Sequence, residues 1–75
     1  MAGNLLGERL RSLRLDCNLD RDALGAQAGC SSAYLSFAEK GEVIPSERML
    51  SILAGILNGD LPKLMKLRED AEDPI

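Results

Sequence analysis

Apolar residues recur along the chain at the spacing of amphipathic helices. In the first such stretch they fall at positions i, i+4, i+7 and i+11, the period of one helical face: Leu6, Leu10, Leu13 and Cys17. Asn18 follows, a residue type that tolerates the left-handed backbone angles with which many helices end. The pattern therefore predicts a first helix over residues 5–17.

Capping residues divide the next stretch into two short helices. Asp20 is a good N-cap for a helix that ends at Ala28, and Gly29 supplies the positive φ that a tight turn requires. Ser31 then caps a third helix, which Gly41 terminates. We expect two consecutive helices separated by only a few residues.

The last third of the chain predicts two more helices. Ser46 caps a fourth helix, whose inward stripe is Leu50, Leu53, Ala54 and Leu57. The segment 58–59 ends that helix, and Asp60 caps a fifth helix with Pro62 in its first turn. The inward positions of the fifth helix are Leu61, Leu64 and Leu67.

Length and composition set the fold class. A chain of 75 residues buries only about 60% of its unfolded surface, so one compact core is expected. The apolar content is 45%, with one Tyr, one Phe and no Trp, which suits helices better than sheets. We predict an all-α, five-helix domain over residues 4–68 and an acidic, frayed tail over residues 69–75.

The charge is balanced within the predicted domain and acidic in the tail. The net charge of the chain is −3, and the acidic excess lies in Glu69, Asp70, Glu72 and Asp73. Neither the domain nor the whole chain has the strongly basic balance of a nonspecific nucleic-acid binder.

Most catalytic and cofactor chemistry is excluded by the residues present. The chain has no His and only two Cys, so we expect no metal site, no cofactor, no small-molecule substrate and no enzymatic activity. Cys17 and Cys30 are interpreted as reduced thiols of a cytoplasmic protein. The longest apolar run, residues 52–57, is too short to cross a membrane.

Residues 21–40 have the pattern of a helix-turn-helix. Gly25 has no side chain to obstruct the closest approach of the two helices, and Gly29 lies in the turn. All the inward positions are apolar: Leu24, Ala28, Cys30, Leu35 and Ala38. Cys30 is interpreted as a small core hydrophobe, and Tyr34 as a half-buried packing residue.

Four segments carry a resemblance to a known family: "LGERLRSLR", "LGAQAGCSSAYLSFAEKG", "PSERMLSILAGIL" and "GDLPKL". From about Leu6 to Leu64 the chain resembles the Cro/cI (XRE) helix-turn-helix transcriptional regulators. The resemblance implies a phage-repressor-like DNA-binding domain, whose third helix enters the major groove of operator DNA. It also implies a homodimer on paired half-sites. Ile56, Met65 and Leu67 exceed what a five-helix core needs, so we expect the fifth helix and the end of the fourth to form the interface.

The resemblance assigns roles to individual residues. The base-facing positions are Ser32, Ala33, Ser36 and Phe37, and the phosphate contacts are Arg21, Ser31, Lys40 and Arg48. It also suggests an internal ion pair between Arg14 and Glu39, for which the alternative is two separately solvated surface charges.

The side chains of the predicted reading helix also allow a different function. No Arg, Asn or Gln lies on the base-facing positions, and Glu42 follows the helix where phosphate would lie. Phe37 points outward in this pattern, unless its ring folds against the fourth helix. The alternative is therefore an antiactivator or antitoxin-like module that binds another transcription regulator through Ala33 and Phe37.

Overall fold

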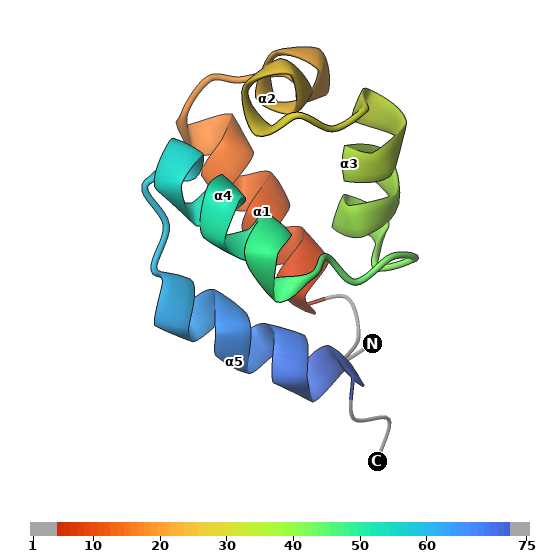
Figure 1. The fold of residues 1–75 in the computed structure, drawn as a ribbon, viewed down its shortest axis with the longest axis vertical. Helices are drawn as coiled ribbons and strands as arrows, with labels where there is room; N and C mark the ends of the chain where they lie inside the picture. Colours follow the sequence, from red (N-terminus) through yellow and green to blue (C-terminus); the bar gives the residue numbers. More distant parts are fainter. Residues whose placement is uncertain (1–4, 73–75) are drawn as a thin grey trace.

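The computed structural model describes residues 5–72, which form five helices and no strand (Figure 1). In chain order these are α1 (Leu5–Asp16), α2 (Arg21–Ala28), α3 (Ser32–Lys40), α4 (Glu47–Leu57) and α5 (Leu61–Glu72). The all-α, five-helix fold predicted from the sequence is confirmed. No helix within residues 5–72 combines the length and apolar character needed to span a membrane.

Side-chain caps begin α2 to α5 at the predicted residues. In each case a side-chain oxygen accepts a hydrogen bond from the backbone N–H three residues later, which satisfies a donor that the helix itself leaves unpaired. The donor–acceptor distances are 2.7 Å for Asp20, 3.1 Å for Ser31, 3.1 Å for Ser46 and 3.3 Å for Asp60.

Left-handed residues end the helices. Gly29 follows α2 with φ of 77°, and Gly41 follows α3 with φ of 82°. Asn18 and Asn58 adopt φ of 57° and 55° after α1 and α4. Asn accepts this conformation more readily than most residues with a Cβ, so the short connections follow from local sequence.

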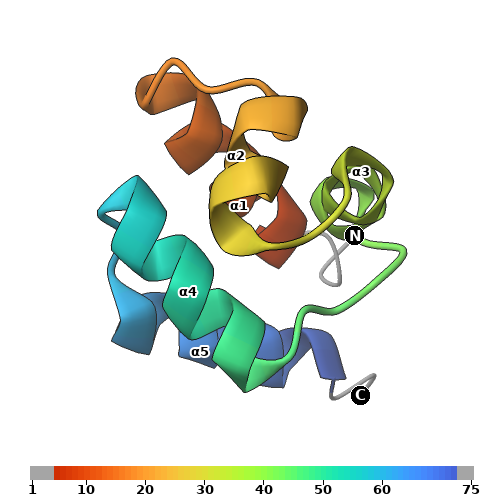
Figure 2. The ribbon, with the colours of Figure 1, turned by 45° about the horizontal axis from the view of Figure 1, so that its top comes forward.

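The core lies where the inward faces of all five helices meet. α1 packs against α3 and α5, and α4 packs against α2 and α5, while α2 packs against α3 (Figure 2). The buried apolar residues are Leu6, Leu10, Leu24, Ala28, Leu35, Ala38, Leu50, Leu53, Ala54, Leu57 and Leu64. Leu61 and Leu67 are only half-buried, because they flank the Leu64 position that faces the centre.

Two glycines allow close helix contacts. A Cβ at Gly25 would overlap the carbonyl oxygen of Cys30, so the predicted closest approach within the helix-turn-helix is present. A Cβ at Gly7 of α1 would lie 2.5 Å from the carbonyl oxygens of Ala38 and Glu39 in α3. The second contact brings α1 directly against the end of α3 and was not predicted from the sequence.

Two boundaries differ from the prediction. α1 ends at Asp16, and Cys17 lies beyond it, exposed, where its thiol donates to the Leu57 carbonyl oxygen at 3.6 Å. The pattern had placed Cys17 on the buried stripe, but Asn18 turns the backbone before that face can continue.

Helix α5 continues through residues 69–72, which the sequence assigned to the tail. Lys66 pairs with Asp70 at 3.8 Å one turn later, a spacing that supports an exposed helix. Arg68 donates to the Pro45 carbonyl oxygen at 2.7 Å and so attaches the helix to the loop before α4. Residues 73–75 of the predicted tail lie outside the described residues.

Candidate nucleic-acid interface

Helices α2 and α3 form a helix-turn-helix with a tightly closed turn. The backbone N–H groups of Gly29 and Cys30 both donate to the Gly25 carbonyl oxygen, at 2.8 and 3.0 Å. The chain therefore leaves α2 and begins α3 within a few residues, with Ser31 as the cap of α3. This arrangement leaves one side of α3 uncovered while Leu35 and Ala38 enter the core.

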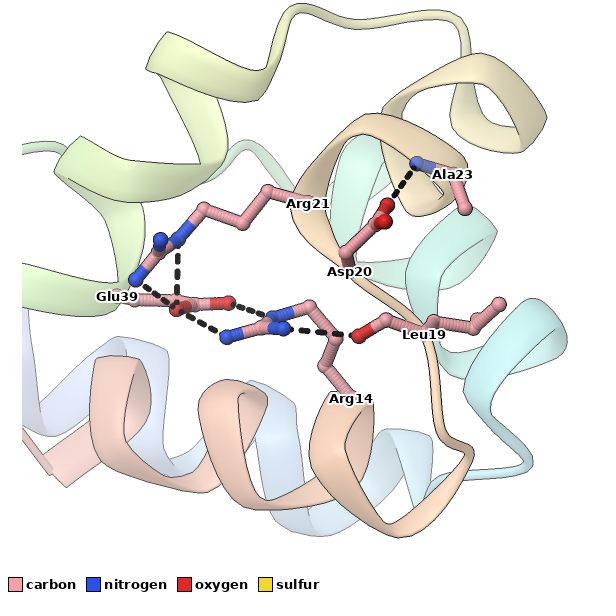
Figure 3. Close-up of polar contacts among 6 residues, drawn as sticks. All are labelled: Arg14, Leu19, Asp20, Arg21, Ala23 and Glu39. Atoms are coloured by element: carbon pink, nitrogen blue, oxygen red, sulfur yellow. Dashed lines mark hydrogen bonds and ion pairs between the residues drawn. The ribbon is translucent and has the colours of Figure 1, made fainter.

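A buried ion pair fixes α3 to α1. Arg14 Nε donates to Glu39 Oε2 at 2.7 Å and Arg14 Nη2 to Oε1 at 3.2 Å (Figure 3). Arg14 Nη1 also donates to the Leu19 carbonyl oxygen at 2.8 Å. Each partner is only 6% exposed, so the structure has the internal pair and not two solvated charges.

Arg21 is a third member of this cluster. Its Nε and Nη2 lie 3.2 and 3.1 Å from Glu39 Oε1, and its side chain remains 40% exposed (Figure 3). Two guanidinium groups share one carboxylate, so the cluster keeps a net positive charge. Because Arg14 is buried, that charge is accessible to solvent only at Arg21. The sequence assigned Arg21 to phosphate and did not predict this pairing, which depends on the packing of α2 against α3.

The four base-facing candidates share the open side of α3. Ala33 and Phe37 are exposed, and Ser32 and Ser36 are half-buried beside them. The Phe37 residue is 45% exposed, so its ring is not folded into the core. The four positions thus form one accessible surface, which carries an aromatic ring and small side chains.

Residues of both helices line a hollow of about 390 Å³ between them. Its walls are Asp20, Arg21, Asp22, Ser32, Ala33 and Ser36. The two carboxylates were not predicted to lie beside the base-facing positions. Asp20 caps α2 and Asp22 lies in its first turn. In a helix-turn-helix this turn lies beside the start of α3, so these two sequence positions could have predicted the placement.

Two of the remaining phosphate candidates, Ser31 and Lys40, lie at the two ends of α3, and Arg48 lies in the first turn of α4. Lys40 and Arg48 are exposed, and Ser31 is exposed with its hydroxyl oxygen accepting from Tyr34 N–H. Glu42 is also exposed, and its backbone N–H donates to the Phe37 carbonyl oxygen at 2.9 Å. This places a carboxylate-bearing residue just after the end of α3, opposite the end near Asp20 and Asp22.

Cys30 and Tyr34 pack beneath the surface. Burial raises the pKa of the Cys30 thiol above its usual value. Burial also raises the pKa of the Tyr34 hydroxyl, and the charge of a Cys30 thiolate raises it further. Both groups stay neutral near pH 7 and serve packing. Among residues 5–72, no group of three or more His, Cys, Asp or Glu side chains is arranged to hold a metal ion.

Comparison with known proteins identifies the same architecture. A family described as "Helix-turn-helix domain" matches residues 5–65. The chain is similar to the crystal structure of the clp gene regulator ClgR from C. glutamicum, with a TM-score of 0.77 and 23% sequence identity. The similarity covers 100% of this chain and 97% of that chain. The comparison with curated proteins found no match.

Proposed function

The chain belongs to the helix-turn-helix domain family, and from this premise we propose that it is a transcriptional regulator that binds operator DNA. The observation that carries the proposal is the placement of α3. Its open side is uncovered over Ser32 to Phe37, and the buried Arg14–Glu39 pair fixes its other side to α1. A rigid helix of this kind fits the major groove of B-DNA.

Base recognition in this proposal is carried by small and apolar side chains. The hydroxyls of Ser32 and Ser36 accept or donate hydrogen bonds with several bases, so they discriminate weakly. Ala33 and Phe37 contact thymine methyl groups. We therefore expect the operator preference to depend on DNA shape and on the positions of thymine. Guanine should matter less, because no Arg lies on the base-facing positions.

Phosphate contacts supply most of the binding free energy. Arg21 contributes the exposed charge of the Glu39 cluster, Lys40 lies at the end of α3, and Arg48 lies in the first turn of α4. Ser31 adds a hydroxyl at the start of α3. With about three or four contacts per protomer, affinity depends steeply on salt concentration.

We also propose a homodimer, with the end of α4 and α5 as the interface. Ile56, Met65 and Leu67 are half-buried against the core, and each keeps some exposed surface. Ile52, one turn before Ile56 on α4, is 36% exposed and extends this surface. Two copies joined here would present two α3 helices to paired half-sites.

A gel-shift assay with the DNA upstream of the gene tests DNA binding. The double variant Arg21→Ala and Lys40→Ala should lose the complex, because it removes two phosphate contacts. The matched control is Lys63→Ala with Lys66→Ala, which removes two exposed charges from α5. Equal binding by both double variants would contradict the assignment of the interface to α2 and α3.

A second candidate function is favoured by the exposure of Phe37. In this alternative the same scaffold is an antiactivator or antitoxin-like module that binds another transcription regulator through Ala33 and Phe37. Phe37→Ala separates the two functions. An aromatic anchor in a protein interface carries much of the affinity, whereas one thymine methyl contact affects preference at a single base position.

A further inference from the structure

We infer that the open side of α3 docks a protein whose surface presents an apolar patch bordered by lysine and arginine side chains. The inference goes beyond DNA binding. It rests on the second candidate function and specifies the chemistry of the partner. Three features of the structure support it: an exposed apolar stripe, carboxylates at both ends of that stripe, and the internal neutralisation of part of the neighbouring positive charge.

The apolar stripe consists of Ala33 and Phe37. They lie four residues apart on α3 and are therefore neighbours on one helical face. Ala33 is exposed and Phe37 is 45% exposed, while the apolar positions of α3 outside the stripe are buried or half-buried. Burying this ring removes a large apolar area from water, so it is a suitable anchor for a protein interface.

Carboxylates flank the stripe. Asp20 and Asp22 line the hollow that Ala33 also lines, at the start of α3. Glu42 lies at the other end, where its backbone N–H bonds to the Phe37 carbonyl oxygen. All three side chains belong to exposed residues, so a partner can reach them.

The neighbouring cations compensate these carboxylates only in part. Arg21, which also lines the hollow, is committed to Glu39 through two of its nitrogens. Lys40 is the other cation of this region. Against three exposed carboxylates, the net positive charge of the Arg14–Glu39–Arg21 cluster and the charge of Lys40 leave the face slightly acidic. An acidic face attracts a basic protein surface.

The composition of the stripe also favours protein over nucleic acid. Ala33 and Phe37 can make only apolar contacts with a base, such as contact with a thymine methyl group. They therefore add little discrimination among bases. An apolar patch on a protein can cover the Phe37 ring, and lysine or arginine side chains at its border would reach Asp20, Asp22 and Glu42. Such a partner would contact both the apolar stripe and the flanking carboxylates, whereas DNA would not pair with the carboxylates.

The test uses a synthetic amphipathic helical peptide of leucine and lysine, and a leucine–glutamate peptide of the same pattern as its control. Each is titrated into the ¹⁵N-labelled full chain, and the perturbed amides are mapped. The lysine peptide should perturb residues 20–22, 33–37 and 42 and weaken as salt increases. The glutamate peptide should not bind.

Variants then separate the contribution of the Phe37 ring to binding from that of the carboxylates. Phe37→Ala should weaken binding of the lysine peptide roughly thirtyfold. Leu15→Ala, which truncates a similarly exposed residue on α1, is the matched control and should have no effect. Asp20→Asn with Asp22→Asn should reduce affinity severalfold and flatten the salt dependence, while Asn preserves the cap of α2. Unchanged melting curves establish that each variant is folded.

Each outcome decides the inference. Absence of binding, equal binding of the two peptides, or equal losses for Phe37→Ala and Leu15→Ala would overturn it. A loss with Phe37→Ala but none with the Asn variants would leave a protein-binding module and overturn the basic partner. A duplex of the upstream DNA that perturbs these amides, when the lysine peptide does not, would overturn the inference and support DNA binding alone.

Discussion

The guanidinium of Arg14 and the carboxylate of Glu39 join α1 to α3 through two hydrogen bonds, at 2.7 and 3.2 Å, and both residues are almost fully buried. Removing one member of such a pair leaves the other charge in the interior without its partner. Arg21 reaches the same carboxylate from solvent. The orientation of the open face of α3 therefore depends on an interior contact.

The pair predicts a large and asymmetric loss of stability. Glu39→Ala should lower the free energy of unfolding by about 3 kcal/mol, because it leaves Arg14 buried and unpaired. Arg21→Ala should cost less than about 1 kcal/mol, since Arg21 is partly exposed and Glu39 retains Arg14. Denaturant melts of these variants, and of Arg14→Ala with Glu39→Ala, measure the coupling. A cost below about 1 kcal/mol for Glu39→Ala would contradict the buried pair.

The glycines predict opposite effects of the same substitution. Gly7→Ala and Gly25→Ala should each destabilise the fold by about 1–3 kcal/mol, because the added methyl group meets backbone carbonyl oxygens that cannot move away alone. Gly55→Ala on α4 is the control. It meets open space, so it should raise the melting temperature through the helix propensity of Ala. Stabilisation by Gly7→Ala would be inconsistent with the contact between α1 and α3.

Alkaline pH should weaken the fold through Cys30 and Tyr34. Burial raises the pKa of both groups in the folded state, from ordinary values of 9.0 and 10.0. The stability that they contribute is complete below those ordinary values and is lost as pH rises through the folded-state values. The melting temperature should therefore fall above pH 9, and less so in Cys30→Ala. Cys17→Ala removes the exposed thiol and should keep the full fall.

The proposed dimer predicts a charge-sensitive association. Ile52→Glu should shift the chain to monomer in sedimentation, because a carboxylate would be buried at the interface. Leu15→Glu changes a residue of α1 that is 47% exposed and should leave the dimer intact. A wild-type chain that remains monomeric at tens of micromolar would remove the dimer, and with it the expectation of paired half-sites.

Local sequence was sufficient to predict the helices and the open face of α3. Caps such as Ser46 act on their own helix, and left-handed residues such as Gly41 end it, so both are readable without tertiary information. The sharing of Glu39 by Arg21 and the contact at Gly7 depend on how helices cross. The position of Asp22 beside Ala33 depends on the same packing, which no periodicity encodes.

The salt dependence of DNA binding tests the central claim most directly, since the claim is that α2 and α3 form a DNA interface. Fluorescence anisotropy of the labelled upstream duplex should show that log K falls with log salt at a slope of about −3 for each protomer. Arg21→Ala should reduce the magnitude of the slope by about 0.9. The absence of any salt-sensitive complex at micromolar protein would contradict DNA binding by this helix-turn-helix.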